Sequence, residues 1–382
     1  MPTRMGQECT TRTAAYHSRV RIICVDVGTG TQDILLFDSA KEIENCVQMV
    51  MPSPTVTVAA RVRRATERGE PIVLTGVTAG GGPSMWAVED HLRAGYPVYA
   101  VPAAAQSFDD DLKKLARLGI RLIDANDVER HDSRFRVEMA DLNLFAIAKA
   151  LEAFGVEPEW DALAVAVFDH GAAPPDVSDR RFRFNYLARA LSAERDLVAL
   201  AHRGDAIPPF LTRMRAVAAT APADIPLVVM DTGPAAALGA QCDSRVRDCD
   251  PALLINIGNL HTLAFHVEGG AVVGLFEHHT GELTGSRLGL YLDELVEGTI
   301  SNDAVFADKG HGALTWTRRG TTDHFRAVTG PRRALLAGTT PTPYAAAPCG
   351  DMMLTGCFGL LRACARYLPE ATGAIHAALG VA

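Results

Sequence analysis

The chain of 382 residues lacks any run of about 18 apolar residues, the least that a membrane-spanning helix needs. Its first 20 residues also lack the apolar core of a secretion signal. We therefore expect a cytoplasmic protein that does not enter a membrane. Its eight cysteines are expected to be reduced there, and no two of them form a Cys-x-x-Cys pair.

An excess of positive charge is missing as well. The formal net charge is −8, which argues against the backbone of a nucleic acid as the main partner. Hydrophobic residues make up 48% of the chain and charged residues 21%. A chain of this length and composition can bury a sizeable core and form more than one lobe, as expected of a soluble α/β enzyme.

The most informative segment is a glycine-rich turn near the N-terminus. Residues 22–25 have the β-branched composition of a buried strand, and residues 34–37 resume it after a polar hairpin. The turn between them, residues 26–31, reads Asp-Val-Gly-Thr-Gly-Thr. A strand, a glycine turn and a second strand form a geometry that suits phosphate.

Each residue type in this turn has a use in binding an anion. Gly28 and Gly30 let backbone amides approach the anion because no Cβ stands in the way. Thr29 and Thr31 add hydroxyl donors beside them. Asp26 is a candidate to hold Mg²⁺ through water, since this ion keeps most of its hydration shell. The alternative is an ordinary hairpin with a solvated aspartate, because turns favour the same residues.

A similar unit recurs at residues 251–283. It has apolar strands over residues 253–257, 263–267 and 272–276, and a glycine turn joins the first two. The candidates for phosphate binding in this turn are Gly258, Asn259, His261 and Thr262. Two copies of the unit imply two lobes that face one ligand.

Two further segments have small residues at a strand-to-helix junction. In residues 226–241 a strand ends at Asp231, and a helix of small residues follows with Pro234 in its first turn. Residues 350–368 read as a strand, a glycine turn and a helix. We expect Gly356 at that turn, where an adenine or ribose can lie against the backbone.

This order of motifs resembles the superfamily of actin, heat-shock chaperones and sugar kinases. Residues 26–31 are similar to its first phosphate motif and residues 256–262 to its second. Residues 231–241 are similar to its first connecting helix, and residues 354–359 to its adenosine motif. The resemblance implies an α/β fold of two ribonuclease-H-like lobes, an actin-like ATPase fold whose interlobe cleft holds ATP and Mg²⁺.

The resemblance also implies the domain boundaries. Residues 1–18 are expected to form a loose tail, and residues 19–245 the first ribonuclease-H-like lobe with its connecting helix. Residues 246–382 are then the second lobe. It includes the C-terminal adenosine-type turn and helix, and an irregular segment over residues 300–349 that is rich in Gly, Thr, Pro and Arg.

Within the superfamily the chain resembles a prokaryotic family labelled pyruvate formate-lyase activating enzyme-related. A radical-SAM activating enzyme needs three closely spaced cysteines to hold its iron-sulfur cluster, and the eight cysteines here offer no such triplet. The second phosphate turn departs from the superfamily because it begins with Asn256 instead of an acid. Asn256 can still bind a water of Mg²⁺, but it brings no charge, so the phosphate donor need not be ATP.

Asp169 and His170 follow a buried strand expected over residues 162–168. Open α/β sheets place their chemistry at the carboxyl ends of such strands. Sugar kinases of this fold use a carboxylate to deprotonate the acceptor hydroxyl, so the resemblance makes Asp169 the candidate base. His170 is the alternative base, and a capping role is the alternative for Asp169.

A second cluster of polar residues ends the second unit. His261, His279 and Glu282 are candidates for a metal site of imidazole and carboxylate ligands. A hydrogen-bonded or surface histidine cluster is the alternative. Adjacent histidines on a strand point to opposite faces, so only one of His278 and His279 can share a face with Glu277 while the strand continues.

Three functions follow from these observations. The leading hypothesis is a small-molecule kinase, a transferase, or an ATPase that closes its lobes on Mg-ATP and a small-molecule substrate. The second is an activator ATPase that remodels a partner enzyme. The third is a metal-dependent enzyme that retains the fold and uses no ATP.

Overall fold

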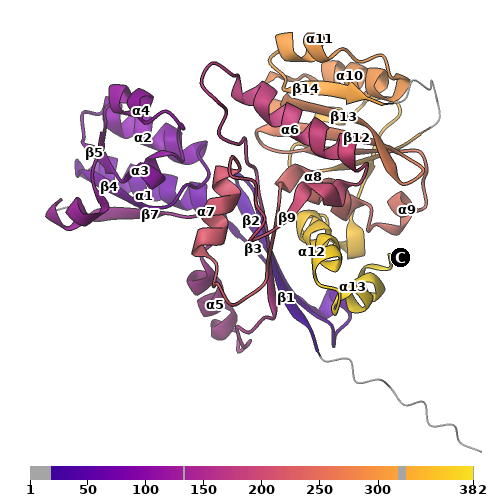
Figure 1. Cartoon of the computed structure of the whole chain (residues 1–382), viewed down its shortest axis with the longest axis horizontal. Coiled ribbons are helices and arrows are strands. Elements are labelled where there is room, and N and C mark those ends of the chain that lie inside the picture. The colour runs from indigo at the N-terminus through magenta and orange to yellow at the C-terminus, as the bar shows by residue number, and fades with distance from the viewer. Residues whose placement is uncertain (1–18, 132–133, 317–323, 382) are drawn as a thin grey trace, which may run out of the picture.

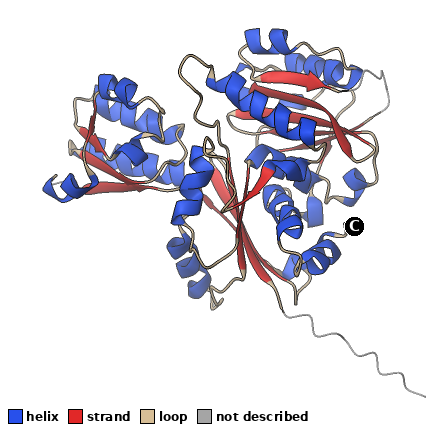
Figure 2. Ribbon diagram, in the orientation of Figure 1, coloured by secondary structure: helices blue, strands red, loops and turns tan. Residues whose placement is uncertain are grey.

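The computed structural model describes residues 19–131, 134–316 and 324–381, and the tail expected over residues 1–18 lies outside them. The described residues form three β-sheets with helices packed on and between them (Figures 1 and 2). The α/β class predicted from the sequence is confirmed, with mixed sheets. None of the helices in these three ranges combines the length and the apolar character that crossing a membrane requires.

The first sheet contains the glycine-turn unit that stands out in the sequence. In spatial order its strands are β3 (Val47–Pro52), β2 (Thr31–Asp38), β1 (Arg21–Val27), β8 (Ala162–Val167), β10 (Leu227–Met230) and β9 (Ala201–Arg203). Strands β1 to β3 form an antiparallel meander, and β8 and β10 continue the sheet parallel to β1. Strands β1 and β8 are buried along their whole length, as their run of apolar residues predicts.

The second sheet contains the recurring unit. In spatial order its strands are β14 (Gly312–Thr315), β13 (Ala271–His279), β12 (His261–Glu268), β11 (Ala252–Ile257), β15 (Phe325–Thr329) and β16 (Tyr344–Ala345). Strands β11 to β13 are again an antiparallel meander, and β15 and β16 are again parallel to β11. The two sheets therefore share the order and the senses of their five main strands.

Strands β14, β15 and β16 correct one expectation. Residues 300–349 were expected to be irregular, but the described part of this segment supplies three strands of the second sheet and helix α11 (Asn302–Ala307). The Gly, Thr, Pro and Arg composition conceals strands that are only two to five residues long. Such short strands have too few residues for a clear alternating pattern.

The third sheet was not expected as a separate unit. Its strands are β6 (Ile120–Leu122), β5 (Val98–Ala100), β4 (Ile72–Gly76) and β7 (Phe135–Met139), all parallel. Its helices are α1 (Pro54–Arg68), α2 (Pro83–Arg93), α3 (Pro102–Ala105) and α4 (Leu112–Leu118). The alternating elements of residues 54–139 thus form a module with its own hydrophobic core, which projects on the left of Figure 1.

Two helices pack closely between the first and the second sheet. Helix α8 (Thr232–Ala240) contacts α12 (Thr355–Tyr367) more extensively than any other pair of elements in the described residues. Helix α12 also packs on β1, β8 and β10, so the C-terminal part of the chain returns to the first sheet. One continuous core includes Ile23 of β1, Phe358 of α12 and Leu254 of β11.

The remaining helices fill the faces of the sheets. They are α5 (Leu144–Ala153), α6 (Asp179–Ala193), α7 (Thr212–Thr220), α9 (Ser244–Arg247), α10 (Gly285–Glu297) and α13 (Thr372–Leu379). Helix α5 follows β7 after a short connection, with Asn143 as its N-cap. Helix α6 precedes β9 and β10 in the chain but lies against β13 and β14 of the second sheet (Figure 1).

Candidate functional site

The two glycine turns of the meanders lie tip to tip. In each turn the first glycine amide donates to the carbonyl three residues on: Gly28 N to Thr31 O and Gly258 N to His261 O, both at 2.9 Å. A Cβ atom built on Gly30 would lie 3.3 Å from Asn259 Nδ2. The structure therefore brings together two turns that are far apart in the sequence and closed in the same way.

The tips of both turns leave backbone amides free. Within the described ranges, the amides of Thr29, Gly30, Asn259 and Leu260 donate no hydrogen bond. The first turn is held from behind by Ser53, whose hydroxyl donates to Thr29 O at 2.8 Å and whose amide donates to Gly30 O at 3.1 Å. Amides held this way around a small gap are the donors of an anion-binding nest.

Other residues predicted for the second turn have structural contacts. The Thr262 hydroxyl is buried and hydrogen-bonds Thr280 Oγ1 at 2.9 Å, and Thr280 in turn donates to Gly258 O. Asn256 is the last residue but one of β11, and its Oδ1 would lie 2.9 Å from a Cβ built on Gly330. Thr262 thus supports the turn from below, whereas Asn256 is only partly buried.

The module that holds the third sheet has a loop of three glycines, residues 80–82, which contacts both turns. A Cβ on Gly82 would lie 3.5 Å from Leu260 Cδ1 and 3.8 Å from Thr29 Cγ2. The loop is anchored by side chains that bind its backbone: Ser84 Oγ donates to Gly80 O at 3.0 Å, and Thr55 Oγ1 donates to Gly81 O. The projecting module therefore reaches the turns through a fixed loop.

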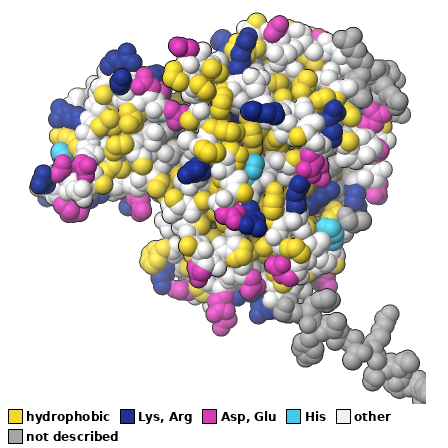
Figure 3. Space-filling view, viewed as in Figure 1, with side chains coloured by type: hydrophobic (Ala, Val, Ile, Leu, Met, Phe, Trp, Pro, Cys, Tyr) yellow, Lys and Arg dark blue, Asp and Glu magenta, His cyan; other side chains and the backbone are white. Residues whose placement is uncertain are grey.

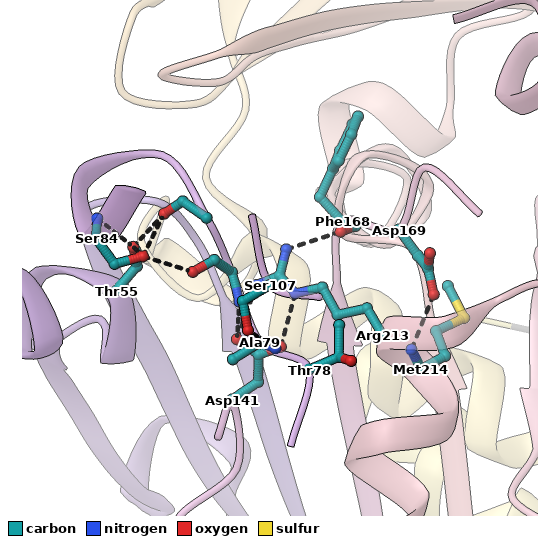
Figure 4. Close-up of polar contacts among 12 residues, drawn as sticks. Thr55, Thr78, Ala79, Ser84, Ser107, Asp141, Phe168, Asp169, Arg213 and Met214 are labelled. Carbon is teal, nitrogen blue, oxygen red and sulfur yellow. Dashed lines mark hydrogen bonds and ion pairs between the residues drawn. The ribbon is translucent and has the colours of Figure 1, made fainter. Parts of the chain in front are cut away.

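A salt bridge connects the same loop to the end of β8. Gly80 N donates to Asp141 Oδ1 at 3.1 Å, and Asp141 pairs with Arg213 at 2.6 Å. Arg213 also donates to Phe168 O at 2.7 Å, as Figure 4 shows. Sequence reasoning missed this link because its members come from three distant segments.

Asp26 is buried at the end of β1. Its Oδ1 accepts a hydrogen bond from Thr232 Oγ1 at 2.7 Å, and its Oδ2 occupies the place where a Cβ on Gly356 would be, only 1.9 Å away. Burial, followed by the negative charge of Asp33, raises the pKa of Asp26 to about 7 against the opposing hydrogen bond from Thr232. Asp26 is therefore a proton-binding group near neutral pH.

Gly356 lies in a helix and not at the expected turn between a strand and a helix. It is the second residue of α12 and is buried, and no strand precedes that helix in residues 350–354. The glycine is needed because any side chain here would collide with the Asp26 carboxylate. The role of Gly356 beside a nucleoside stays a prediction.

The raised pKa of Asp26 predicts a pH dependence of stability. Because the folded state keeps the proton up to about pH 7 and the unfolded chain releases it near 3.8, the folded state binds more protons between these values. Stability from this group therefore falls as pH rises through that window, by about 4 kcal/mol in all. Asp26→Asn should lack this fall in urea-unfolding series between pH 4 and pH 8. Asp224→Asn, at an exposed position, should follow the wild type, and an Asp26→Asn curve parallel to the wild type would contradict the assignment.

Asp169 is placed as a cap. Its Oδ1 accepts from Gly171 N at 2.8 Å, and its Oδ2 accepts from Met214 N at 2.9 Å in the first turn of α7 (Figure 4). Burial raises the pKa of Asp169. These contacts are those of the capping alternative, and the role of Asp169 or the neighbouring His170 as a base stays a prediction.

A buried ion cluster lies beneath the turns, and no motif in the sequence predicts it. Arg183 of α6 donates to Asp231 Oδ2 at 2.6 Å and to Glu277 Oε1 at 2.8 Å, and its guanidinium carbon lies 3.7 Å from the centre of the Phe168 ring. The three charged side chains are 0%, 2% and 0% exposed. Burial raises the pKa of Glu277 to about 7 against the opposing charge of Arg183. The cluster joins α6 to the end of β10 and to the second sheet.

Four histidines lie close together in the structure, and two of them, His261 and His279, belong to the cluster predicted from the sequence. His170, His261 and His311 have ligand atoms that all lie within 4.8 Å of one another. His279 lies beside them, with its ring centre 4.6 Å from that of His311 and 4.9 Å from that of His261. Glu282 does not belong to the group, because it is exposed and pairs with Lys309 at 2.9 Å, which corrects the predicted carboxylate ligand.

Burial also sets the protonation of these histidines. Desolvation by the surrounding protein lowers the pKa of His170 to about 3 although part of this residue is exposed to solvent, with the positive charge of Arg183 as the next cause, and burial lowers the pKa values of His261, His279 and His311. All four rings are neutral at pH 7. His311 was missed in the sequence, where the only signal is a single histidine between Gly310 and Gly312.

Residues 79–335 match the family described as putative pyruvate format-lyase activating enzyme (DUF1786). The chain belongs to this family. The match includes the second glycine turn, the ion cluster and all four histidines, whereas the first glycine turn lies before residue 79. A comparison with curated proteins finds no match.

Three solved structures resemble this member of the family. The ethanolamine utilization protein EutJ from Carboxydothermus hydrogenoformans is 12% identical over 89% of this chain and 88% of the other, with a TM-score of 0.30. The Ppx/GppA family member of Aquifex aeolicus is 10% identical over 86% and 72%, with a TM-score of 0.28. An exopolyphosphatase-like protein is 10% identical over 94% and 90%, with a TM-score of 0.26.

Proposed function

We propose that this member of the family is an ATP-binding protein of the actin-like superfamily, an ATPase or a small-molecule kinase that acts in the cytoplasm. The observation that carries the proposal is the meeting of two equivalent glycine turns whose four tip amides have no acceptor within the described residues. Amides converging from two sides suit the β- and γ-phosphates of a nucleotide, because each turn can bind one of them.

The shared strand order of the two sheets supports a hinged arrangement. Each turn joins the first two strands of its own sheet, so a relative movement of the sheets changes the gap between the tips. In the structure Asn259 fills that gap beside Gly30. The proposal therefore requires the turns to separate for ATP entry and to close again around the phosphates, which excludes water from the transferred group.

The donor groups near the turns fit Mg²⁺ held through its own water. Both oxygens of Asp26 already have contacts, one to Thr232 and one to the backbone of α12, so a direct bond to the ion would break them. Mg²⁺ retains several waters and is bound through one or two protein oxygens. Asp26 and Asn256 are the proposed holders, and the ion would neutralise charge on the phosphates when bound.

Calorimetric titration of ATP with and without Mg²⁺ tests the proposal. The wild type should bind ATP more tightly with Mg²⁺, and Gly30→Ala should weaken binding at least about 10-fold because its Cβ enters the gap between the tips. Gly281→Ala is the matched control, since a Cβ there would have no atom within 4 Å.

Either of two results would overturn the proposal. One is the absence of binding by the wild type at millimolar ATP, and the other is an unchanged affinity in Gly30→Ala. Phosphate release then separates the two forms of the function: an ATPase hydrolyses ATP alone, whereas a kinase needs an acceptor.

The description of the family favours a second candidate, an activator ATPase that remodels a partner enzyme. The cysteines rule out the cluster chemistry of a radical-SAM activating enzyme, so activation would have to come from nucleotide-driven closure. Slow basal hydrolysis that a partner enzyme stimulates would support this candidate, and hydrolysis that depends only on a small acceptor would contradict it.

A further inference from the structure

The histidine cluster is assembled from three separate elements. His170 follows β8 of the first sheet, His261 begins β12, and His311 directly precedes β14 of the second sheet. The ring centres of His170 and His261 are 5.3 Å apart, and those of His261 and His311 are 5.1 Å apart. The three rings therefore come together through the packing of the two sheets, and not because the histidines are neighbours on one strand.

The rings carry buried nitrogens that no protein group satisfies. Within residues 19–131, 134–316 and 324–381, neither ring nitrogen of His311 and not Nε2 of His261 has a hydrogen-bond partner. An unpaired buried polar atom costs about 1–3 kcal/mol, and such atoms are rare in folded proteins. A metal ion shared by the three rings would bind Nε2 of His261 and one nitrogen of His311, and so would satisfy two of these three atoms.

The surroundings decide the kind of ligand. Glu282 pairs with Lys309, and Glu277 binds Arg183 through Oε1, while its Oε2 has no hydrogen-bond partner within the described residues. The clustered donor atoms are imidazole nitrogens, which suit Zn²⁺ and similar transition metals and do not suit Mg²⁺ or Ca²⁺. Arg183 acts on all three rings, but two carboxylates balance its charge, so it does not oppose a cation strongly. Arg180 is a second positive charge on this side, because its guanidinium donates to Gly310 O beside His311.

Packing fixes the central ring. His261 stacks on Phe168 with ring centres 3.8 Å apart, and the guanidinium of Arg183 lies on the Phe168 ring. His311 is held through its backbone, whose amide donates to Glu277 O at 2.9 Å. Rings positioned in this way need little reorganisation to bind a metal.

We propose that His170, His261 and His311 form a site for a divalent transition metal such as Zn²⁺. Zn–N bonds of 2.0–2.1 Å in a tetrahedral site require nitrogens about 3.3 Å apart, so the rings close in from their present spacing of up to 4.8 Å. His170 is exposed, which leaves the fourth position on its side open to water or to a substrate oxygen. Three protein ligands and one open position are the pattern of catalytic zinc sites.

The site does not depend on the proposed nucleotide function, although the His261 carbonyl closes the second turn. It takes a different metal, uses neither Asp26 nor Asn256, and needs no ATP. A failure of ATP binding would therefore leave the metal site standing, and the reverse holds as well.

Zn²⁺ titration of the full chain after chelator treatment is the test. The wild type should bind one equivalent per chain, and His170→Gln and His311→Gln should each weaken binding at least about 100-fold. His170 is exposed, so its replacement keeps the fold even if that of buried His311 does not. His376→Gln on α13 is the matched control and should bind as the wild type does.

Co²⁺ substitution identifies the donor atoms. A three-histidine site should give visible d–d absorption without the charge-transfer band of a thiolate, and His170→Gln should remove that absorption. A thiolate band would assign the metal to the cysteines and overturn the proposal. Unchanged Zn²⁺ affinity in His170→Gln, or no saturable binding by the wild type, would overturn it too.

Discussion

Arg183→Met is expected to destabilise the protein by about 3–5 kcal/mol, since it leaves two carboxylates in the core without their cation. Asp231 and Glu277 are almost completely buried and bind Arg183 at 2.6 Å and 2.8 Å. Methionine fills most of the volume but supplies no hydrogen-bond donor. The loss should be larger than that of a typical core substitution, because charge as well as packing is affected.

Urea unfolding at pH 8 measures this loss, with Arg189→Met as the control. Arg189 lies on the same helix α6 and is exposed, so its replacement should change stability by less than about 0.5 kcal/mol. The triple variant Arg183→Met, Asp231→Asn, Glu277→Gln should recover much of the loss, because neutral amides replace the stranded charges. If Arg183→Met proved as stable as Arg189→Met, the two carboxylates would be protonated or hydrated in the folded protein.

The same variant probes how the two sheets are coupled. Arg183 also donates to Asp169 O at 2.7 Å, so it connects the ends of β8 and β10 with β13 of the second sheet. If the sheets unfold as one unit, both should lose stability together in the variant. Two separate unfolding transitions in the variant would show that the ion cluster is the main interaction that couples the two sheets.

Local signals in the sequence predicted several elements of the fold. The β-branched run at residues 22–25 lies in β1, and the run at residues 34–37 lies in β2. Pro234 lies in the first turn of α8, as expected, with Asp231 as its N-cap. In each case the decisive interactions are made by residues within a few positions of one another.

The failures have the opposite character. The third sheet is a separate module because of where its strands pair, and pairing is not encoded in the composition of one strand. Position 356 of α12 requires a glycine because the carboxylate of Asp26, distant in the sequence, occupies the space that a side chain would need. His311 and Arg183 gain their significance only from distant partners, and no spacing rule relates either of them to His170 or to Glu277.

On the face drawn in Figure 3, basic and acidic side chains are interspersed, so no broad field of one sign covers it. Charge on that face therefore does not single out a binding surface. The features that single out a place are the partly buried turn tips, the buried ion cluster and the histidines, which lie at the ends of β8 and β10 and of the two meanders. The positions of the turns and of these side chains therefore indicate a functional site better than the charge on this face does.

Gly359→Ala is expected to cost at least about 3 kcal/mol, because it separates the two helices that join the sheets. A Cβ on Gly359 would lie 1.8 Å from Ala235 O in α8, and a Cβ on Gly239 of α8 would lie 1.8 Å from Thr355 O in α12. The obstacles are backbone atoms, so no rotation of a side chain relieves the overlap. The helices must move apart, and the core on both sides of them loses contacts.

Gly373→Ala in α13 is the control that makes this measurement specific. It is the same substitution in a helix, but a Cβ there would have no atom within 4 Å, so the variant should gain up to about 1 kcal/mol from helix propensity. Thermal and urea unfolding of both variants should therefore shift in opposite directions. If Gly359→Ala also proved stabilising, the helices would be free to separate, and hinge motion between the sheets would cost little.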